Sequence, residues 1–361
     1  MSTRRGPEND AGPRIHQVDL MTEVSEHGGV LTPSLSFAGP MADRATGAIG
    51  HVAYAILRSQ AFVALPQLGT TIGTLADPLR VAQERYQSLP EAERAAATGT
   101  LELLGRATHW ELIGRLGVIV DNLAALMDAV EAYRAGEDVD YAKILLRHEL
   151  DVLAAVGAKR RRQLSYWERM ANAPQQTQLL AAGLTNAEAK ALKAGTRRWA
   201  FAAVRTMDRL RAYYTERMHH VYLRFKHGYT LVSPGVSRLH VRLRDAKESA
   251  AINDALARGF CIIHQTYDGR RILEIVQSSP EDLEACMRTA REAVGLAERL
   301  AVAWTLELEH GEGWSAATIP PPVAERAVWA DYASALRKWA GPDFLAIYPA
   351  ASPPQEAAPP D

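Results

Sequence analysis

The chain has 361 residues, of which 47% are hydrophobic and 23% are charged, and these proportions are typical of a globular protein with a sizeable core. Its 41 Lys and Arg residues are balanced by 42 Asp and Glu residues, which excludes a globally basic surface that would attract nucleic acid or membranes. Two cysteines outside any CxxC pair, Cys261 and Cys286, exclude a disulfide framework and predict two buried thiols in a reducing compartment.

The two ends of the chain differ in composition from the rest. Residues 1–45 are rich in Gly, Pro, Ser and charge, and residues 350–361 are AASPPQEAAPPD, so we predict a disordered N-terminal arm and a disordered tail. Residues 1–19 contain no apolar signal-peptide segment, and the chain has no run of about 18 apolar residues. We therefore expect a soluble, cytoplasmic protein that does not enter a membrane.

Helical periodicity dominates residues 46–228, where apolar residues recur every three or four positions. A Thr185-x-x-Glu188 capping box and an Asp-Pro pair at Asp77 mark two helix starts. We predict helices over residues 46–66, from Asp77 to Pro90, from Pro90 through the apolar stripe of 110–134, over 140–172, from Pro174 to Gly195 and over 197–226.

After residue 228 the pattern changes to short alternating segments. We predict strands at 229–232, 238–244, 260–266 and 271–277, with a turn at Asp268-Gly269, and helices at 247–257, 279–309 and 322–339. The fold class is then mainly α. It comprises a helical bundle over 46–228, a small antiparallel β-sheet with a packing helix over 229–310, and a linker with a C-terminal helix over 311–349.

The end of the helix predicted at 197–226 gathers cationic side chains. At about 100° per residue, one face is apolar and should face the core, namely Met207, Tyr214, Met218, Val221 and Phe225. The opposite face carries Arg209, Tyr213, Glu216, His220 and His227, with Arg217 and Arg224 on the boundary.

This cationic helix end has two interpretations. Arginine offers a planar fork of donors to phosphate oxygens, and histidine exchanges a proton near neutral pH. His220, His227, Arg217 and Arg224 are therefore candidate catalytic residues, and Lys226 is a candidate phosphate ligand. Alternatively, it is a solvated basic helix terminus, which the helix dipole alone favours.

Two further basic stretches stand out. Arg238, His240, Arg242 and Arg244 share one face of a predicted strand and could contact nucleic-acid phosphates. Alternatively, they could keep an edge strand from pairing. The run 159–162 lies within a predicted helix, as a solvated face or a phosphate-contacting patch.

The segment Tyr222-Leu-Arg-Phe-Lys-His-Gly-Tyr229 resembles the Tyr-x-Lys/Arg-x-Lys-His-Gly signature of bacterial helical proteins allied to the HEPN superfamily. The resemblance extends over residues 100–230 in layout and implies a helical bundle that leads into short strands. HEPN ribonucleases carry an Arg four to six residues before a His, often across a dimer interface. No Arg has that spacing before His219, His220 or His227.

We therefore expect an HEPN-like helical protein that binds RNA, a nucleotide or a protein partner, either as a single chain or as a homodimer. One alternative is a metal-independent ribonuclease acting as a toxin or defence effector. Another is a structural scaffold without a ligand. The motifs predict neither a cofactor nor a metal site, because the chain has no phosphate-binding glycine loop and no HExxH pattern.

Overall fold

A computed structural model provides the structure. It describes residues 40–146, 152–172, 174–227, 231–232, 240–257, 259–265, 270–277, 279–311, 334–335 and 338. The rest of the predicted N-terminal arm, the predicted tail and most of the predicted helix at 322–339 lie outside these residues.

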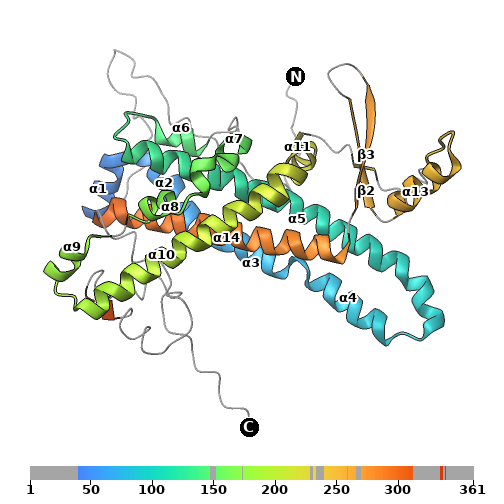
Figure 1. Cartoon of the computed structure of the whole chain (residues 1–361), viewed down its shortest axis with the longest axis horizontal. Coiled ribbons are helices and arrows are strands. Elements are labelled where there is room, and N and C mark those ends of the chain that lie inside the picture. Colours follow the sequence, from blue (N-terminus) through green and yellow to red (C-terminus); the bar gives the residue numbers. More distant parts are fainter. Residues whose placement is uncertain are drawn as a thin grey trace, which may run out of the picture.

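The described residues are mainly helical, which confirms the predicted class (Figure 1). The N-terminal half contains α1 (Pro40–Ile49), α2 (His51–Ser59), the π-helix η1 (Gln60–Ala64), α3 (Leu65–Leu75), α4 (Asp77–Ser88) and α5 (Glu91–Arg134). Helix α4 starts and ends where the sequence predicts, and the apolar stripe of 110–134 is buried along α5.

The start of the helical region differs from the prediction. The predicted arm is helical over its last six residues, because α1 begins at Pro40. The helix predicted at 46–66 is interrupted at Gly50, which has φ +83°, and then continues past Pro66. The hydrogen bonds shift in η1, where Leu65 N–H bonds to the carbonyl of Gln60, and this rearrangement accommodates the proline.

No single helix in the described ranges is long and apolar enough to cross a membrane, although α1 and residues 51–88, bent by 111°, together meet the length and composition of a span.

The middle of the chain is more broken than predicted. It contains α6 (Tyr141–Leu145), α7 (Val152–Gly157), the 3₁₀-helix η2 (Lys159–Arg162), α8 (Leu164–Met170), α9 (Gln176–Ala181), α10 (Asn186–Arg209), the π-helix η3 (Leu210–Met218) and α11 (His219–His227). The single helix predicted at 140–172 is therefore wrong. The capping box at Thr185 is confirmed, but α10 starts there and runs past Gly195 without a break.

The C-terminal part contains β1 (Leu231–Val232), α13 (Ala246–Ala257), β2 (Gly259–Gln265), β3 (Arg271–Gln277) and α14 (Pro280–His310). The strand order is β1-β2-β3, and both neighbouring pairs are antiparallel. Gln265 pairs with Arg271. Gly259 is required at its position, because an added Cβ would lie 2.4 Å from the carbonyl oxygen of Val276.

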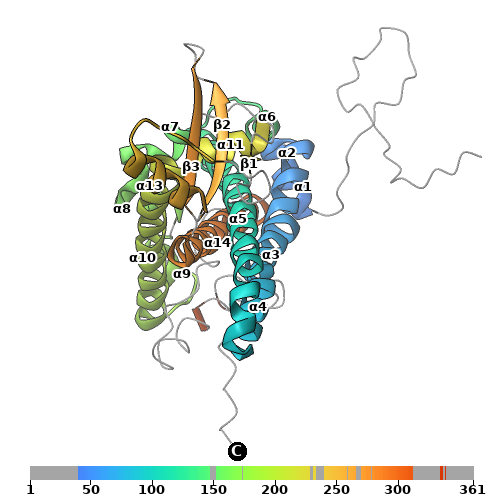
Figure 2. The same ribbon diagram turned by 90° about the vertical axis from the view of Figure 1, so that its right-hand side faces the viewer.

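Helix α14 forms the centre of the helical body, with α10 on one side and α3 and α5 on the other (Figure 2). Every residue from Leu300 to Glu309 is buried, and Trp304 is fully buried against Tyr133 and Tyr141. The β-hairpin and α13 extend beyond the helical body (Figure 1). Helix α14, which we assigned with the hairpin to one predicted unit over 229–310, packs mainly against α5, α3 and α1.

Glu188 connects the start of α10 to the C-terminal segment. Its carboxylate accepts hydrogen bonds from Ser334 Oγ at 2.5 Å and from Lys338 Nζ at 2.9 Å, and it closes the capping box with the N–H of Thr185. These hydrogen bonds lower the pKa of Glu188 from 4.5 to about 2, and the bond from Ser334 contributes most.

The lowered pKa of Glu188 predicts a specific acid sensitivity. A carboxylate whose pKa is lower in the folded state stabilises the fold above its unfolded value, and this contribution is lost as the pH falls through the folded value. We expect Glu188→Gln to flatten the decline of the free energy of unfolding between about pH 4.5 and 2, measured by urea titration at several pH values. Glu102→Gln, an exposed site on α5, should leave the decline unchanged, and equal profiles for wild type and Glu188→Gln would refute this role.

Candidate functional site

The helix predicted at 197–226 changes its hydrogen-bond pattern in η3. Each residue advances less around the axis of a π-helix than around an α-helix, because its hydrogen bonds span five residues. Met207 and Val221 are buried as predicted, but Tyr213, which we assigned to the opposite face, is also buried. Our assignment of Tyr213 to the cationic face is therefore wrong.

Tyr213 belongs to a buried polar cluster between α5 and α14. Its hydroxyl lies 3.1 Å from Nε2 of His109. Burial lowers the pKa of His109 to about 4, against the opposing charge of Asp282, so this imidazole is uncharged at neutral pH. An uncharged, buried imidazole is suited to holding Tyr213 in place rather than to binding an anion.

Both cysteines are free and buried, which confirms the two predicted buried thiols. Burial raises the pKa of Cys261 to about 11 and that of Cys286 to about 12. Each therefore remains a protonated thiol at neutral pH, and neither is activated as a nucleophile.

Lys226 is held by helix α5 through an acidic residue. Its Nζ lies 3.3 Å from Oδ2 of Asp121. The same carboxylate oxygen accepts a hydrogen bond from the Tyr222 hydroxyl at 2.8 Å. The ring of Tyr222 lies directly over Gly117, where an added Cβ would approach Cδ2 of the ring to 2.0 Å. Tyr222 therefore docks α11 against α5, and the Lys226 ammonium already has a carboxylate partner.

His220 projects from α11 toward the hairpin and is hydrogen-bonded through Nε2 to Oε1 of Glu274 on β3. The two residues line a small cavity of about 360 Å³ that also includes Asp282. Two carboxylates beside the imidazole disfavour a phosphate there. The other predicted catalytic residues, Arg217, Arg224 and His227, lie on helical backbone, but their side chains are outside the described part of the chain.

The basic run 159–162 is not mid-helix, and Arg161 within it is buried. Its guanidinium pairs with Asp128 and Glu131 on α5 and donates to the carbonyl of Ala155. Both predicted roles for the run, a solvated helix face and a phosphate-contacting patch, are therefore wrong for Arg161. Its neighbour Arg160 is exposed and also pairs with Glu131.

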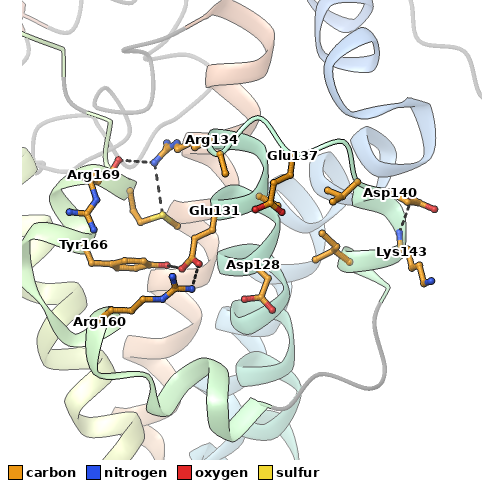
Figure 3. Close-up of a pocket in the computed structure, with 14 residues that line it drawn as sticks. Asp128, Glu131, Arg134, Glu137, Asp140, Lys143, Arg160, Tyr166 and Arg169 are labelled. Carbon is orange, nitrogen blue, oxygen red and sulfur yellow. Dashed lines mark hydrogen bonds and ion pairs between the residues drawn. The ribbon is translucent and has the colours of Figure 1, made fainter.

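A cavity of about 770 Å³ lies where the end of α5 meets α6 and α8 (Figure 3). Glu131 accepts hydrogen bonds there from Arg160 and Tyr166. Arg134 bonds to the main-chain carbonyl of Arg169 and to Glu307. Because these opposite charges neutralise one another, the cavity presents no net charge that would select an anion.

The strand predicted at 238–244 is not a strand over its described residues, 240–244. Instead, the side-chain amide of Asn253 on α13 accepts from the N–H of Val241 at 2.9 Å and donates to its carbonyl at 2.8 Å. Ser249 Oγ accepts from the N–H of Leu243 at 2.7 Å. In an extended chain, the N–H and C=O groups of alternate residues point to the same side. The main-chain groups of Val241 and Leu243 both bond to α13, so the segment is extended but pairs with the side chains of a helix instead of with a strand.

The predicted cationic side chains alternate along residues 240–244 with Val241 and Leu243, and they lie in solvent. His240, Arg242 and Arg244 are exposed, and so are Lys247 at the start of α13 and Arg271 on β3. Among the residues that the structure describes, no carboxylate forms an ion pair with Arg242 or Arg244. Arg238 lies outside the described residues.

Ser249 and Asn253, which hold this segment, were not among the predicted site residues. Their spacing of four residues on a predicted helix is the only signal that could have suggested a shared polar face.

A scan against protein-family models, a search of curated proteins and a search of solved structures each return no match. The HEPN-like relationship therefore stays a prediction that rests on the residues of the Lys226-His227-Gly228 segment.

Proposed function

We propose that the protein binds RNA through its phosphate backbone, with residues 240–247 as the contact surface. The observation that carries this proposal is the exposed position of Arg242 and Arg244, without an acidic partner among the described residues, on a segment held extended by α13. Guanidinium groups held in this way bind phosphate oxygens well.

The hydrogen bonds from Asn253 and Ser249 matter for affinity as well as for structure. They fix the backbone on which His240, Arg242 and Arg244 stand. Binding a nucleic acid then costs less conformational entropy than it would for an unrestrained basic loop. Asn253 is a positioning residue for this surface.

The location of the segment supports contact with a large ligand. It adjoins α13, which extends beyond the helical body together with β2 and β3 (Figure 1). The proposed surface therefore lies on the part of the molecule that projects from the helical body (Figure 1). Contacts to phosphates alone carry no sequence information, so we expect little dependence on base sequence.

We infer an HEPN-like ancestry for the helical body as part of the same proposal. The Lys226-His227-Gly228 signature and the order of bundle and strands support it. We do not extend the proposal to ribonuclease chemistry, because His220 faces Glu274 and Lys226 faces Asp121.

The test is the affinity of the full chain for a labelled RNA oligonucleotide, measured by fluorescence anisotropy. The double variant Arg242→Ala/Arg244→Ala should bind about tenfold more weakly or worse. A matched control, Arg85→Ala/Arg205→Ala, removes two exposed arginines from α4 and α10 and should bind as wild type does. If both double variants lose the same affinity, the effect is one of net charge alone and the proposed surface is wrong.

A further inference from the structure

A second candidate site lies between α10 and α14, far in sequence from residues 240–247. The hollow has a volume of about 280 Å³ and is lined by Trp199, Ala203 and Thr206 from α10 and by Arg291, Gly295 and Arg299 from α14, among others. Its volume suits a small molecule rather than a chain segment.

Gly295 creates this hollow. Arg291, Gly295 and Arg299 are spaced four residues apart, so they share one face of α14. A Cβ added at Gly295 would meet no atom within 4 Å. The two arginines therefore lie one turn before and one turn after an empty position on the same helix face.

A threonine hydroxyl lines the hollow without a hydrogen bond to any described residue. Thr206 is 6% exposed, and no described residue hydrogen-bonds to its Oγ1. Other buried threonines in helices of this protein, Thr196, Thr289 and Thr305, each donate to the carbonyl four residues earlier. The Thr206 hydroxyl lines the hollow and is available to donate to a ligand oxygen there.

The charges around the hollow favour an anion. Glu292 is the single carboxylate among its lining residues, and it is paired with Arg209. Arg291 is exposed and donates to the carbonyl of Gly73 on α3 at 3.4 Å. Arg299 forms no ion pair within the described ranges, and its charge acts on the neighbouring Glu298, whose pKa burial raises and Arg299 lowers.

We propose that this hollow binds a compact oxyanion, either inorganic phosphate or the phosphate group of a small metabolite. Arg299 would hold the anion above Gly295, Arg291 would turn from the carbonyl of Gly73 on α3 to reach it, and the Thr206 hydroxyl would donate to one of its oxygens. Guanidinium forks match the paired oxygens of a phosphate group.

Inorganic phosphate, titrated by isothermal calorimetry at constant ionic strength, tests this proposal. Wild type should show saturable binding. Arg299→Gln should weaken it at least tenfold, whereas Arg288→Gln, on the same helix but paired with Glu284, should bind as wild type does. Equal binding by wild type and Arg299→Gln, or no saturable heat with wild type, would overturn the site.

A second variant separates loss of binding from loss of folding. Gly295→Leu places a side chain in the empty space and should raise the melting temperature, because glycine is unfavourable within a helix, yet it should abolish phosphate binding. Gly295→Leu that still binds phosphate would contradict the proposal. A phosphomonoester that binds more tightly than inorganic phosphate would identify the metabolite as the source. Arg242→Ala/Arg244→Ala should keep phosphate binding, so this site and the RNA surface fail independently.

Discussion

Replacing Arg161 with Ala is expected to lower the free energy of unfolding by about 3–5 kcal/mol. The substitution leaves the partly buried Asp128 without a counter-charge among the described residues, and Glu131 with only the exposed Arg160. The Arg161 side chain is 4% exposed and pairs with both Asp128 and Glu131. The Tyr166 hydroxyl bonds to the same Glu131, and burial raises the pKa of Tyr166 well above its ordinary value. Urea denaturation followed by circular dichroism measures the loss.

Arg160 provides the matched control for Arg161. It is the preceding residue and pairs with the same carboxylate of Glu131, but its side chain is 66% exposed. Exposed ion pairs contribute between about 0 and 1 kcal/mol, so Arg160→Ala should have a small effect. If Arg161→Ala and Arg160→Ala lower the free energy of unfolding equally, the burial of Arg161 does not explain its contribution to stability.

Replacing Gly117 with Ala is expected to destabilise the protein by about 1–3 kcal/mol through overpacking, although alanine is the better helix former. The new Cβ would lie 2.0–2.3 Å from three atoms of the Tyr222 ring. The ring cannot retreat easily, because its hydroxyl bonds to Asp121 and its centroid lies 6.2 Å from that of Tyr214. We therefore expect α11 to shift away from α5.

Gly105 on the same helix is the control for Gly117. A Cβ added there would have its nearest contact at 4.0 Å, with Cδ1 of Leu79. Gly105→Ala should therefore stabilise the protein by roughly 0.5–1 kcal/mol, the usual gain from removing glycine within a helix. The melting temperatures of the two variants should move in opposite directions, and a rise for Gly117→Ala would show that Tyr222 does not pack closely on α5.

Signals confined to a few neighbouring residues predicted structure well. The capping box at Thr185 and the Ser279-Pro280 start of α14 each appear at the expected residue. Helix α4 also begins at Asp77, but Asp77 is its first residue and not its N-cap, and its side chain forms no capping hydrogen bond. A cap satisfies main-chain groups of its own helix, so it needs no information about distant residues. The apolar stripe along α5 was equally readable, because periodicity alone decides which face is buried.

The sequence could not predict features that depend on distant partners. Arg161 looks like part of a solvated basic run until α5 brings Asp128 and Glu131 to it across about thirty residues. Alternation at 240–244 predicted the extended backbone, but alternation does not say whether a strand or the side chains of α13 will bind it. The hollow at Gly295 needs both α10 and α14 and has no signal in either helix alone.

The candidate site was also predicted only in part. The exposed positions of His240, Arg242 and Arg244 agree with the cationic face expected there. The carboxylates that face His220 and Lys226 belong to Glu274 and Asp121, which lie 54 and 105 residues away in the sequence and so could not be predicted from local patterns. Because His220 and Lys226 already have these carboxylate partners, we place the proposed contact surface on the segment beside α13 and not at the end of α11.

The most direct measurement of the central claim is the salt dependence of RNA affinity. Each phosphate contact on a single strand contributes a slope of about 0.7 to the fall of log K with log salt concentration. If Arg242 and Arg244 each contact a phosphate, removing both should reduce the slope by about 1.4. A slope that is the same for wild type and Arg242→Ala/Arg244→Ala would show that RNA does not bind at this surface.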